Sequence, residues 1–126
     1  MSQTATKERN VRVPPFAAPH VYVVAVVDGE SPNAAYRIDR PNNVLGRGAR
    51  ADIRIEDPEI SKNHCELVVD GPTCTIRDLD SRNGTVINGR RLRSELVQRL
   101  RHLDEIEIGS TRLLFLSGRF RVRAET

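Results

Sequence analysis

Residues 78–90 read DLDSRNGTVINGR and contain two Asn-Gly steps, Asn83-Gly84 and Asn88-Gly89. Asn-Gly is the strongest short-range turn signal in this sequence, because glycine tolerates a positive φ and asparagine nearly does. We therefore predict two tight turns, and the polar residues before Asn83 should gather at a turn between strands.

Outside this stretch, short apolar or alternating segments predict further strands. Val21–Val27 is a near-continuous apolar run, suited to a strand that is covered on both faces. Segments bounded by turn residues predict the other strands, at 52–56, 65–69, 74–77, 105–108, 112–116 and 119–123. Four leucines recur at a helical spacing, which indicates either a single short helix or an irregular loop that these leucines hold in place. They are Leu92, Leu96, Leu100 and Leu103. The expected fold class is therefore all-β, a sandwich or barrel with at most one short helix.

The length of 126 residues fits one domain. Residues 1–19 are polar and then interrupted by prolines, so we expect a flexible N-terminal tail, followed by the domain over 20–118. Residues 119–126 would form a C-terminal strand or the start of a linker. The net charge is +3 and the only lysines are Lys7 and Lys62, so arginine dominates the cations. Arginine suits an anionic partner, although a solvated surface would have the same composition.

Composition argues against several other classes of protein. Aromatic residues make up 4% of the chain and tryptophan is absent, which disfavours a base-stacking platform for single strands. The longest apolar run is too short to span a membrane, so we expect a cytoplasmic protein with no membrane partner. Cys65 and Cys74 occupy apolar positions of neighbouring strands, where reduced core thiols are expected. There is no CxxC and no metal spacing among the histidines, so no metal or cofactor is expected.

Three local patterns resemble sites but lack the context that each site needs. Residues 46–51 fit the dinucleotide fingerprint G-x-G-x-x-A, which requires a helix after the glycines, whereas an alternating strand follows. Ser61 and His64 have no nucleophile elbow around them, so we expect no enzyme activity. Alternating arginines at Arg119, Arg121 and Arg123 fit a solvated edge strand better than a nucleic-acid stripe.

Three polar clusters in a fixed order carry most of the information. They are Leu45-Gly46-Arg47, then Ile60-Ser61-Lys62-Asn63-His64, then residues 78–89. Together they resemble the forkhead-associated (FHA) domain, whose pattern is Gly-Arg, Ser-x-x-His, Ser-x-Asn-Gly-Thr and Asn-Gly. The resemblance covers roughly residues 21–116.

This resemblance implies an FHA-type β-sandwich of about eleven strands whose loops at one end recognise phosphothreonine. By resemblance, Arg47, Ser61 and Lys62 would hold the phosphate, and Asn83 would bond the peptide backbone. Arg82 stands where the family often has a threonine or serine that contacts the phosphothreonine. Six further residues would shape the loops: Gly46, His64, Gly84, Thr85, Asn88 and Gly89. The chemistry agrees, because arginine supplies a charged fork, serine a short donor and lysine a point charge for phosphate oxygens.

Three positions depart from the family pattern. Ser61-Lys62-Asn63-His64 replaces the usual Ser-Arg-Arg-His, which keeps a charge at Lys62 but loses a bidentate fork. Arg82 adds a cation beside the phosphate position. Leu103-Asp104 replaces the usual Gly-Asp before a late strand, so the loop there should differ in shape.

The expected function is a phosphothreonine-dependent protein–protein interaction module, acting as a monomer downstream of a Ser/Thr kinase and without nucleic acid. Thr4 or Thr6 could supply an intramolecular phosphorylated ligand. Arg82 and the loops around Arg50 and Arg90 favour acidic neighbours of the phosphothreonine. The alternatives are a phosphate-independent structural or oligomerisation module, and the sensor region of a larger enzyme or transcription regulator.

Overall fold

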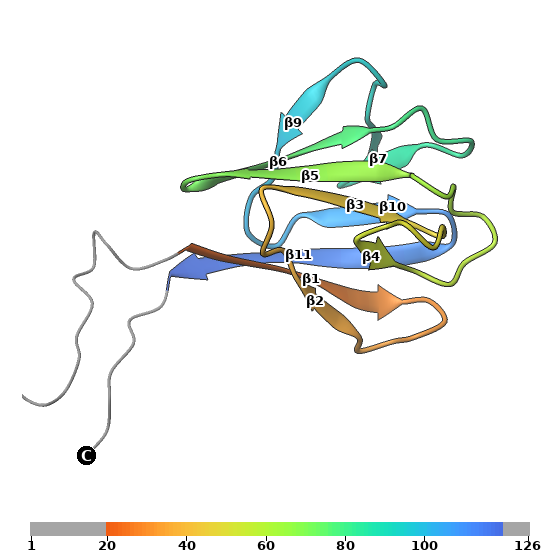
Figure 1. The fold of residues 1–126 in the computed structure, drawn as a ribbon, viewed down its shortest axis with the longest axis horizontal. Helices are drawn as coiled ribbons and strands as arrows, with labels where there is room; N and C mark the ends of the chain where they lie inside the picture. The colour runs from red at the N-terminus through yellow and green to blue at the C-terminus, as the bar shows by residue number, and fades with distance from the viewer. Residues whose placement is uncertain (1–19, 120–126) are drawn as a thin grey trace, which may run out of the picture.

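A computed structural model describes residues 20–119, which form eleven strands and no helix. The strands build two sheets that pack face to face (Figure 1). The first sheet has the order β2-β1-β11-β10-β7-β8, with β1 His20–Asp28, β2 Ala35–Arg37, β7 Thr85–Ile87, β8 Arg90–Arg91, β10 Glu105–Ile108 and β11 Thr111–Arg119. The second has the order β4-β3-β5-β6-β9, with β3 Asn42–Gly46, β4 Ile53–Arg54, β5 Cys65–Asp70, β6 Thr73–Asp78 and β9 Val97–Arg99. The prediction of an all-β sandwich is confirmed.

The core lies between the sheets and is built from alternate residues of the long strands. Val24 on β1 faces inward together with Leu113 and Phe115 on β11, and all three are fully buried. Leu67 on β5 and Ile76 on β6 lie opposite each other in the second sheet and are also fully buried. Each large side chain removed from water in this way stabilises the fold by roughly 1.5–3 kcal/mol.

Strand β1 is covered on only one of its faces by residues 20–119. Tyr22, Val24 and Val26 are buried, whereas Val23 and its alternate neighbours remain partly exposed and Val27 is 47% exposed. The expectation that both faces of the apolar run would be covered is therefore wrong for the outer face. An antiparallel sheet commonly leaves one face to solvent, and that face is then usually polar.

The cysteines lie where the sequence predicts them. Cys65 on β5 and Cys74 on β6 are both buried and both free. Burial raises the pKa of Cys74 to about 12. Burial, followed by the negative charge of Asp78, raises the pKa of Cys65 further. Both side chains therefore stay as thiols at neutral pH and act as small apolar core residues.

The leucine period between 92 and 103 does not form a helix. Leu92 and Leu100 are buried, whereas Leu96 and Leu103 are exposed. The chain between them instead forms β9, which pairs with the edge of β6 through Thr75–Arg77. The interpretation of this segment as a helix is wrong. The alternative, an irregular loop held in place by leucines, agrees with the burial of Leu92 and Leu100.

Leu103 adopts a left-handed backbone conformation, with φ of 76°, and its side chain is 58% exposed. Such a conformation strains any residue with a Cβ, and exposure leaves little packing to offset the strain. We predict that Leu103→Gly raises the free energy of unfolding by about 0.5–1 kcal/mol, measured by urea denaturation. Leu96→Gly is the matched control, because Leu96 is 48% exposed but has no positive φ. A Leu103→Gly protein no more stable than the control would contradict the prediction.

The other predicted segments differ from the structure mainly in length. Only Ile53–Arg54 of the segment 52–56 is a strand, although Ile55 is also buried. Of the predicted strand 119–123 only Arg119 is described, as the end of β11. The tail 1–19, with Thr4 and Thr6, lies outside the described residues. Within residues 20–119, no helix has the length and apolar character needed to cross a bilayer.

Candidate phosphopeptide-binding site

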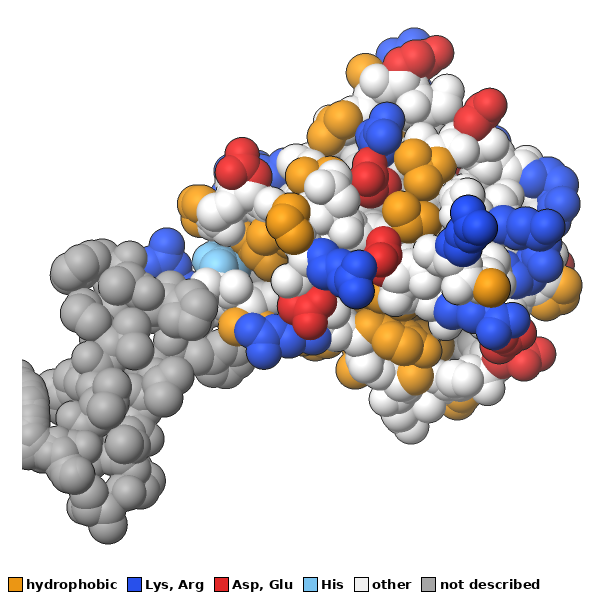
Figure 2. Space-filling view, viewed as in Figure 1, with side chains coloured by type: hydrophobic (Ala, Val, Ile, Leu, Met, Phe, Trp, Pro, Cys, Tyr) orange, Lys and Arg blue, Asp and Glu red, His pale blue; other side chains and the backbone are white. Residues whose placement is uncertain are grey.

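Three loops meet at one end of the sandwich, the end away from the grey residues in Figure 1. They connect β3 to β4, β4 to β5 and β6 to β7, at residues 47–52, 55–64 and 79–84. Lys and Arg side chains gather at this end of the molecule in Figure 2. In the sequence, the three loops carry four cationic residues, Arg47, Arg50, Lys62 and Arg82.

Arg47 joins the first loop to the second. Its backbone N–H donates to the Ser61 carbonyl oxygen at 3.0 Å, and the Gly48 N–H donates to the Lys62 carbonyl oxygen at 3.1 Å. The Arg47 Nε also donates to the Ile60 carbonyl oxygen at 2.9 Å. This bond uses one edge of the guanidinium and orients the side chain. The two terminal nitrogens are then the ones that can face a ligand.

Ser61 joins the second loop to the third. Its Oγ accepts a hydrogen bond from the Arg82 backbone N–H at 2.9 Å. Because the hydroxyl oxygen accepts this bond, the hydroxyl hydrogen can donate to a phosphate oxygen. Arg82 itself is exposed, and its Nη2 donates to the Pro58 carbonyl oxygen at 3.3 Å. The predicted phosphate donor and the unusual arginine are therefore in direct contact.

Asn83 closes the third loop onto the second. Its Nδ2 donates to the Glu59 carbonyl oxygen at 2.8 Å, and a carbonyl partner requires the amide nitrogen in this place. The Asn83 Oδ1 can then accept a backbone N–H from a peptide. Lys62 and Asn63, which follow Ser61 in the second loop, are exposed. The structure thus brings together all five residues proposed for the phosphopeptide: Arg47, Ser61, Lys62, Arg82 and Asn83.

His64 lies beneath these loops and is fully buried. Its Nδ1 accepts the Ser61 backbone N–H at 3.0 Å, and its Nε2 lies 2.8 Å from the Gly84 carbonyl oxygen. A nitrogen that accepts an N–H carries no proton, so Nε2 carries the proton and donates to Gly84. Burial lowers the pKa of His64, against the bond to Gly84 and the charges of Asp78 and Asp57, which raise it. The ring is therefore neutral and links the second loop to the third.

The third loop is folded around a carboxylate that our sequence analysis did not single out. Asp78 accepts hydrogen bonds from the Ser81 N–H at 2.9 Å, the Ser81 hydroxyl at 2.6 Å and the Thr85 hydroxyl at 2.7 Å. The Ser81 Oγ in turn accepts the Gly84 N–H at 2.9 Å. Burial raises the pKa of Asp78, but these bonds outweigh it and hold the pKa below its ordinary value. The spacing Asp-x-x-Ser before a turn was the available signal.

Asn88 and Gly89 lie in a separate turn, between β7 and β8. Both have a positive φ, of 50° and 82°, as a two-residue hairpin turn requires. The Asn88 side chain bonds Asp104 at 2.9 Å and the Glu105 N–H at 2.8 Å. Asn88 therefore positions the start of β10, and its turn is separate from the loops that hold Ser61.

Gly46 sits at the end of β3, where the backbone of the second loop passes close by. A Cβ added there would overlap the Lys62 carbonyl oxygen and come within 3.0 Å of the Ser61 carbonyl oxygen. Both groups are backbone atoms that hold Arg47 and Gly48, so they cannot yield easily. We predict that Gly46→Ala lowers the free energy of unfolding by about 2 kcal/mol and weakens phosphopeptide binding in parallel.

Chemical denaturation and peptide titration of the same sample measure both effects of Gly46→Ala. Gly118→Ala is the control, because a Cβ at Gly118 meets nothing within 4 Å. A Gly46→Ala protein as stable as the Gly118→Ala protein would show that the two loops are not held as tightly as their contacts indicate.

The fold and these loops define a β-sandwich domain of the forkhead-associated class. The family model for the FHA domain matches residues 43–109, and the chain belongs to this family. A solved FHA domain from work on phosphothreonine-dependent FHA interactions superposes with a TM-score of 0.72 and 26% identity, over 79% of this chain and 99% of that one. The FhaA FHA domain, solved with an intracellular domain of another protein, has a TM-score of 0.67 and 28% identity, over 75% and 98% of the two chains.

Curated relatives of this chain are bacterial regulators. The oxoglutarate dehydrogenase inhibitor of Corynebacterium efficiens is 32% identical over 76% of this chain and 66% of its own length. The glycogen accumulation regulator GarA of Mycolicibacterium smegmatis is 31% identical over 76% of this chain and 59% of its own length. The chain thus spans less than two thirds of the length of these two relatives.

Proposed function

We propose that the three loops bind a threonine-phosphorylated segment of a partner protein, with Arg47, Ser61 and Lys62 on the phosphate and Asn83 on the peptide backbone. The observation that carries this proposal is the contact of Arg47 and Arg82 with the Ser61 segment, which places three cationic loops around one hydroxyl donor. Arg47, Ser61 and Asn83 also match the family pattern, whereas Lys62 replaces an arginine and keeps its charge. The Arg47 and Ser61 side chains are held by bonds to the backbone before any ligand arrives, which reduces the ordering cost of binding.

The strength of binding follows from the charges. A phosphothreonine has a charge near −2 and offers three acceptor oxygens. Each charge-assisted hydrogen bond contributes roughly 1.5–3 kcal/mol net. Two or three such bonds, with a few backbone contacts, give a dissociation constant of about 1 μM, or about −8 kcal/mol. Lys62 stands where the family usually has an arginine. It keeps the positive charge but cannot make the two parallel hydrogen bonds of a guanidinium.

Arg82 should give this protein its own preference among phosphopeptides. It is exposed, it is held at Pro58 and Ser61, and it stands where the family often has an uncharged threonine or serine. We predict that acidic residues beside the phosphothreonine strengthen binding, and that Arg82→Ala weakens binding of such peptides by about 3–10-fold. Peptides with neutral neighbours should be affected less.

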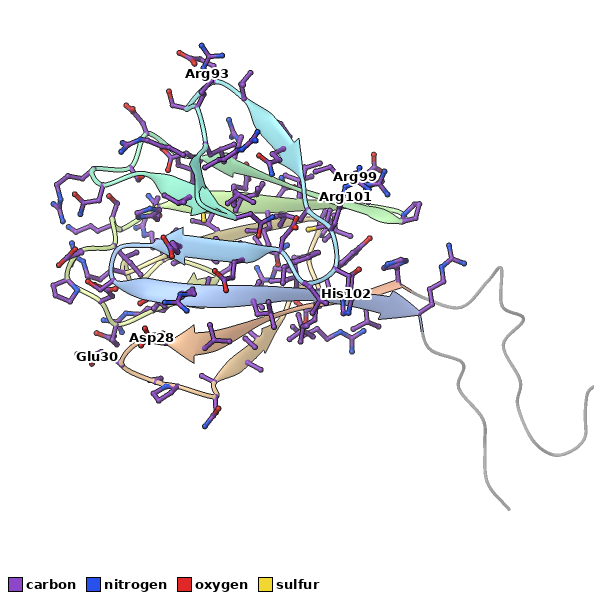
Figure 3. All side chains as sticks on the ribbon, turned by 180° about the vertical axis from the view of Figure 1, so that it is seen from behind. Asp28, Glu30, Arg93, Arg99, Arg101 and His102 are labelled. Carbon is purple, nitrogen blue, oxygen red and sulfur yellow. The ribbon has the colours of Figure 1, made fainter. Side chains whose placement is uncertain are left out.

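Fluorescence polarisation with two matched phosphothreonine peptides, one acidic and one neutral, measures the effect of Arg82. Arg99→Ala is the control, because Arg99 is an exposed arginine at the other end of the sandwich (Figure 3). The difference between the two peptides should also shrink as salt is added. Equal losses for Arg82→Ala and Arg99→Ala would rule out a specific role for Arg82.

The wider role follows from what such a site can do. Docking a phosphorylated partner makes the chain a non-catalytic regulator that responds to a Ser/Thr kinase, inside the cell where such kinases act. The names of the relatives, an inhibitor and a regulator, support this role. Degenerate phosphothreonine libraries, passed over the immobilised protein beside their unphosphorylated counterparts, test it and identify the preferred sequence. Equal capture of both libraries would instead favour a phosphate-independent interaction module.

A further inference from the structure

The outer face of the six-stranded sheet carries an apolar stripe along β1 and β11. Figure 3 looks onto this sheet, and no other strand of residues 20–119 crosses in front of it. We propose that this face is the interface of a symmetric dimer, in which the stripe of one copy packs against the same stripe of a second copy. The proposal is independent of phosphate binding, and it departs from the monomer expected from the sequence.

The pairing register shows which residues make up the stripe. Val23 lies opposite Leu116 and Ala25 lies opposite Leu114, and opposed residues point to the same face of a sheet. Their chain neighbours Val24, Leu113 and Phe115 point into the core, so these four side chains point outward. All four are only partly buried, as the burial pattern of the two strands shows. The stripe also includes Val21 on β1 and Ala35 on β2.

The outer face of the other sheet is built differently. Glu66 and Arg77 lie opposite each other there and form an ion pair at 2.9 Å. The Asn42 Nδ2 also donates to Glu66 at 3.2 Å. Val44 and Val68 also point outward there, but they lie opposite Glu66 and Asn42, so polar side chains interrupt that face. Within residues 20–119, the longer uninterrupted apolar stripe is the one on the β1–β11 face.

The charges beside the stripe identify a second copy as the occupant. Arg37 on β2 lies opposite Val23 and flanks one side, and Glu105 on β10 lies opposite Leu114 and flanks the other. The order β2-β1-β11-β10 is symmetric about the gap between β1 and β11. A two-fold axis along the strands at this gap therefore places β2 of each copy over β10 of the other. Arg37 of each copy then lies on the strand that packs over Glu105 of its partner copy, two residues away along the strands, which these two long side chains can span. Opposite charges on the two flanks of the stripe supply the self-complementarity that a two-fold interface requires.

A second group of charges on this face is only partly compensated within one copy. Arg112 lies 3.7 Å from Glu107 and 3.8 Å from Asp28. One arginine against two carboxylates leaves a net charge of −1 there on each copy, a weak repulsion that salt screens. These charges also mark the end of the apolar stripe near the loop between β10 and β11.

The available area sets the expected strength. Seven residues each of β1 and β11, with three of β2 and about three of β10, give a footprint of roughly 330 Å² per copy, at about 4.8 Å between strands and about 3.4 Å per residue. Both copies together bury about 650 Å², which is below the size of most specific interfaces. We therefore expect a weak dimer that forms at high concentration. Its phosphopeptide loops would stay exposed at the ends of the strands, so a dimer could hold two phosphothreonines, a consequence that rests on the function proposed above.

Sedimentation velocity of the whole chain, between about 1 μM and about 1 mM, measures the dimer. The wild-type protein should shift toward the dimer mass as its concentration rises. Leu114→Glu should raise the dissociation constant of the dimer at least 10-fold, because it places two carboxylates beside the axis. Val68→Glu is the control, because Val68 is a partly exposed residue on the outer face of the other sheet. Circular dichroism and phosphopeptide binding show whether each variant is folded.

A charge exchange tests the second copy specifically, with exposed or partly exposed residues that leave the core intact. Arg37→Glu and Glu105→Arg should each weaken the homodimer about 3–10-fold, and the double variant should regain it. A mixture of the two single variants should form a heterodimer, because both cross-copy pairs are then attractive.

A wild-type chain that stays monomeric at the highest concentration would overturn the proposal. So would a dimer that Leu114→Glu leaves unchanged, or single variants whose mixture fails to associate. Any of these three results would mean that the stripe does not contact a second copy of the chain. Loss of phosphopeptide binding alone would count against the proposed function and would leave the dimer unaffected.

Discussion

Arg47→Ala should weaken binding of a phosphothreonine peptide by about 100-fold or more. Arg47 is half-buried, and its Nε bond to Ile60 holds the guanidinium in place. Loss of a fixed, bidentate cation facing a doubly charged phosphate costs more than loss of a mobile surface charge. Isothermal titration calorimetry with one phosphothreonine peptide measures the change.

Arg47→Lys separates the charge of Arg47 from its shape. Lysine keeps the charge but loses the fork and the Nε bond, so we expect binding about 10-fold weaker than wild type. Thermal unfolding of both variants controls for damage to the loops. If Arg47→Ala binds as tightly as wild type while remaining folded, the phosphate is held elsewhere on the protein.

His64→Ala should lower the free energy of unfolding by about 3 kcal/mol or more. The substitution leaves a cavity where a fully buried ring stood, and it strands the Ser61 N–H and the Gly84 carbonyl without their partner. That loss is a large part of the total stability of a domain this size. Urea denaturation measures it. His102→Ala is the control, because the exposed His102 accepts one backbone N–H, from Ser117 at 3.0 Å, and its loss should cost under about 1 kcal/mol.

The same histidine should make the wild-type protein less stable in mild acid. Burial lowers the pKa of His64 in the folded state, whereas the unfolded chain takes up the proton near pH 6.5. The unfolded state therefore binds more protons below pH 6.5, and the free energy of unfolding falls as the pH drops below that value. Above pH 6.5 this contribution is fully present. A separate loss begins below pH 3.8, because hydrogen bonds outweigh burial and hold the pKa values of Asp57 and Asp78 below that value.

We expect the free energy of unfolding, measured by denaturation between pH 7.5 and pH 5, to change less steeply with pH for His64→Gln than for wild type. Some slope should remain, because burial and then the charge of Arg119 lower the pKa of His20 as well. A His20→Gln protein should therefore still lose stability as the pH falls, by the amount that His64 contributes. Identical slopes for His64→Gln and wild type would mean that the buried ring does not resist protonation.

The sequence predicted the architecture and the position of the loops because those depend on local signals. Asn83-Gly84 and Asn88-Gly89 are turns that their own residues favour, and Gly84, Asn88 and Gly89 all have a positive φ. The family pattern implied that His64 supports the Ser61 loop, and the bond from the Ser61 N–H agrees with this, but the contact with Gly84 could not be predicted. That the His64 ring joins Ser61 to Gly84 depends on a sequence separation of 20 residues that only the sandwich closes.

The failures came where packing overrides a local pattern. Leu96 and Leu103 share a helical period with Leu92 and Leu100, yet only Leu92 and Leu100 are buried. The chain between them does not form a helix, because it pairs with the edge of β6 as β9. The apolar run on β1 predicts a cover on both faces, and residues 20–119 supply one. Whether a further surface covers the second face depends on partners that no local pattern encodes.

The most direct test of the central claim is calorimetric titration of the wild-type protein with three versions of one peptide, carrying phosphothreonine, phosphoserine or unmodified threonine. The loops around Ser61 should bind the phosphothreonine peptide at about 1 μM and the unmodified peptide at least 100-fold more weakly. Phosphoserine should fall between them, because one buried methyl contributes about 0.8 kcal/mol. Equal affinity for the phosphorylated and unmodified peptides, from a folded protein, would contradict phosphate recognition by these loops.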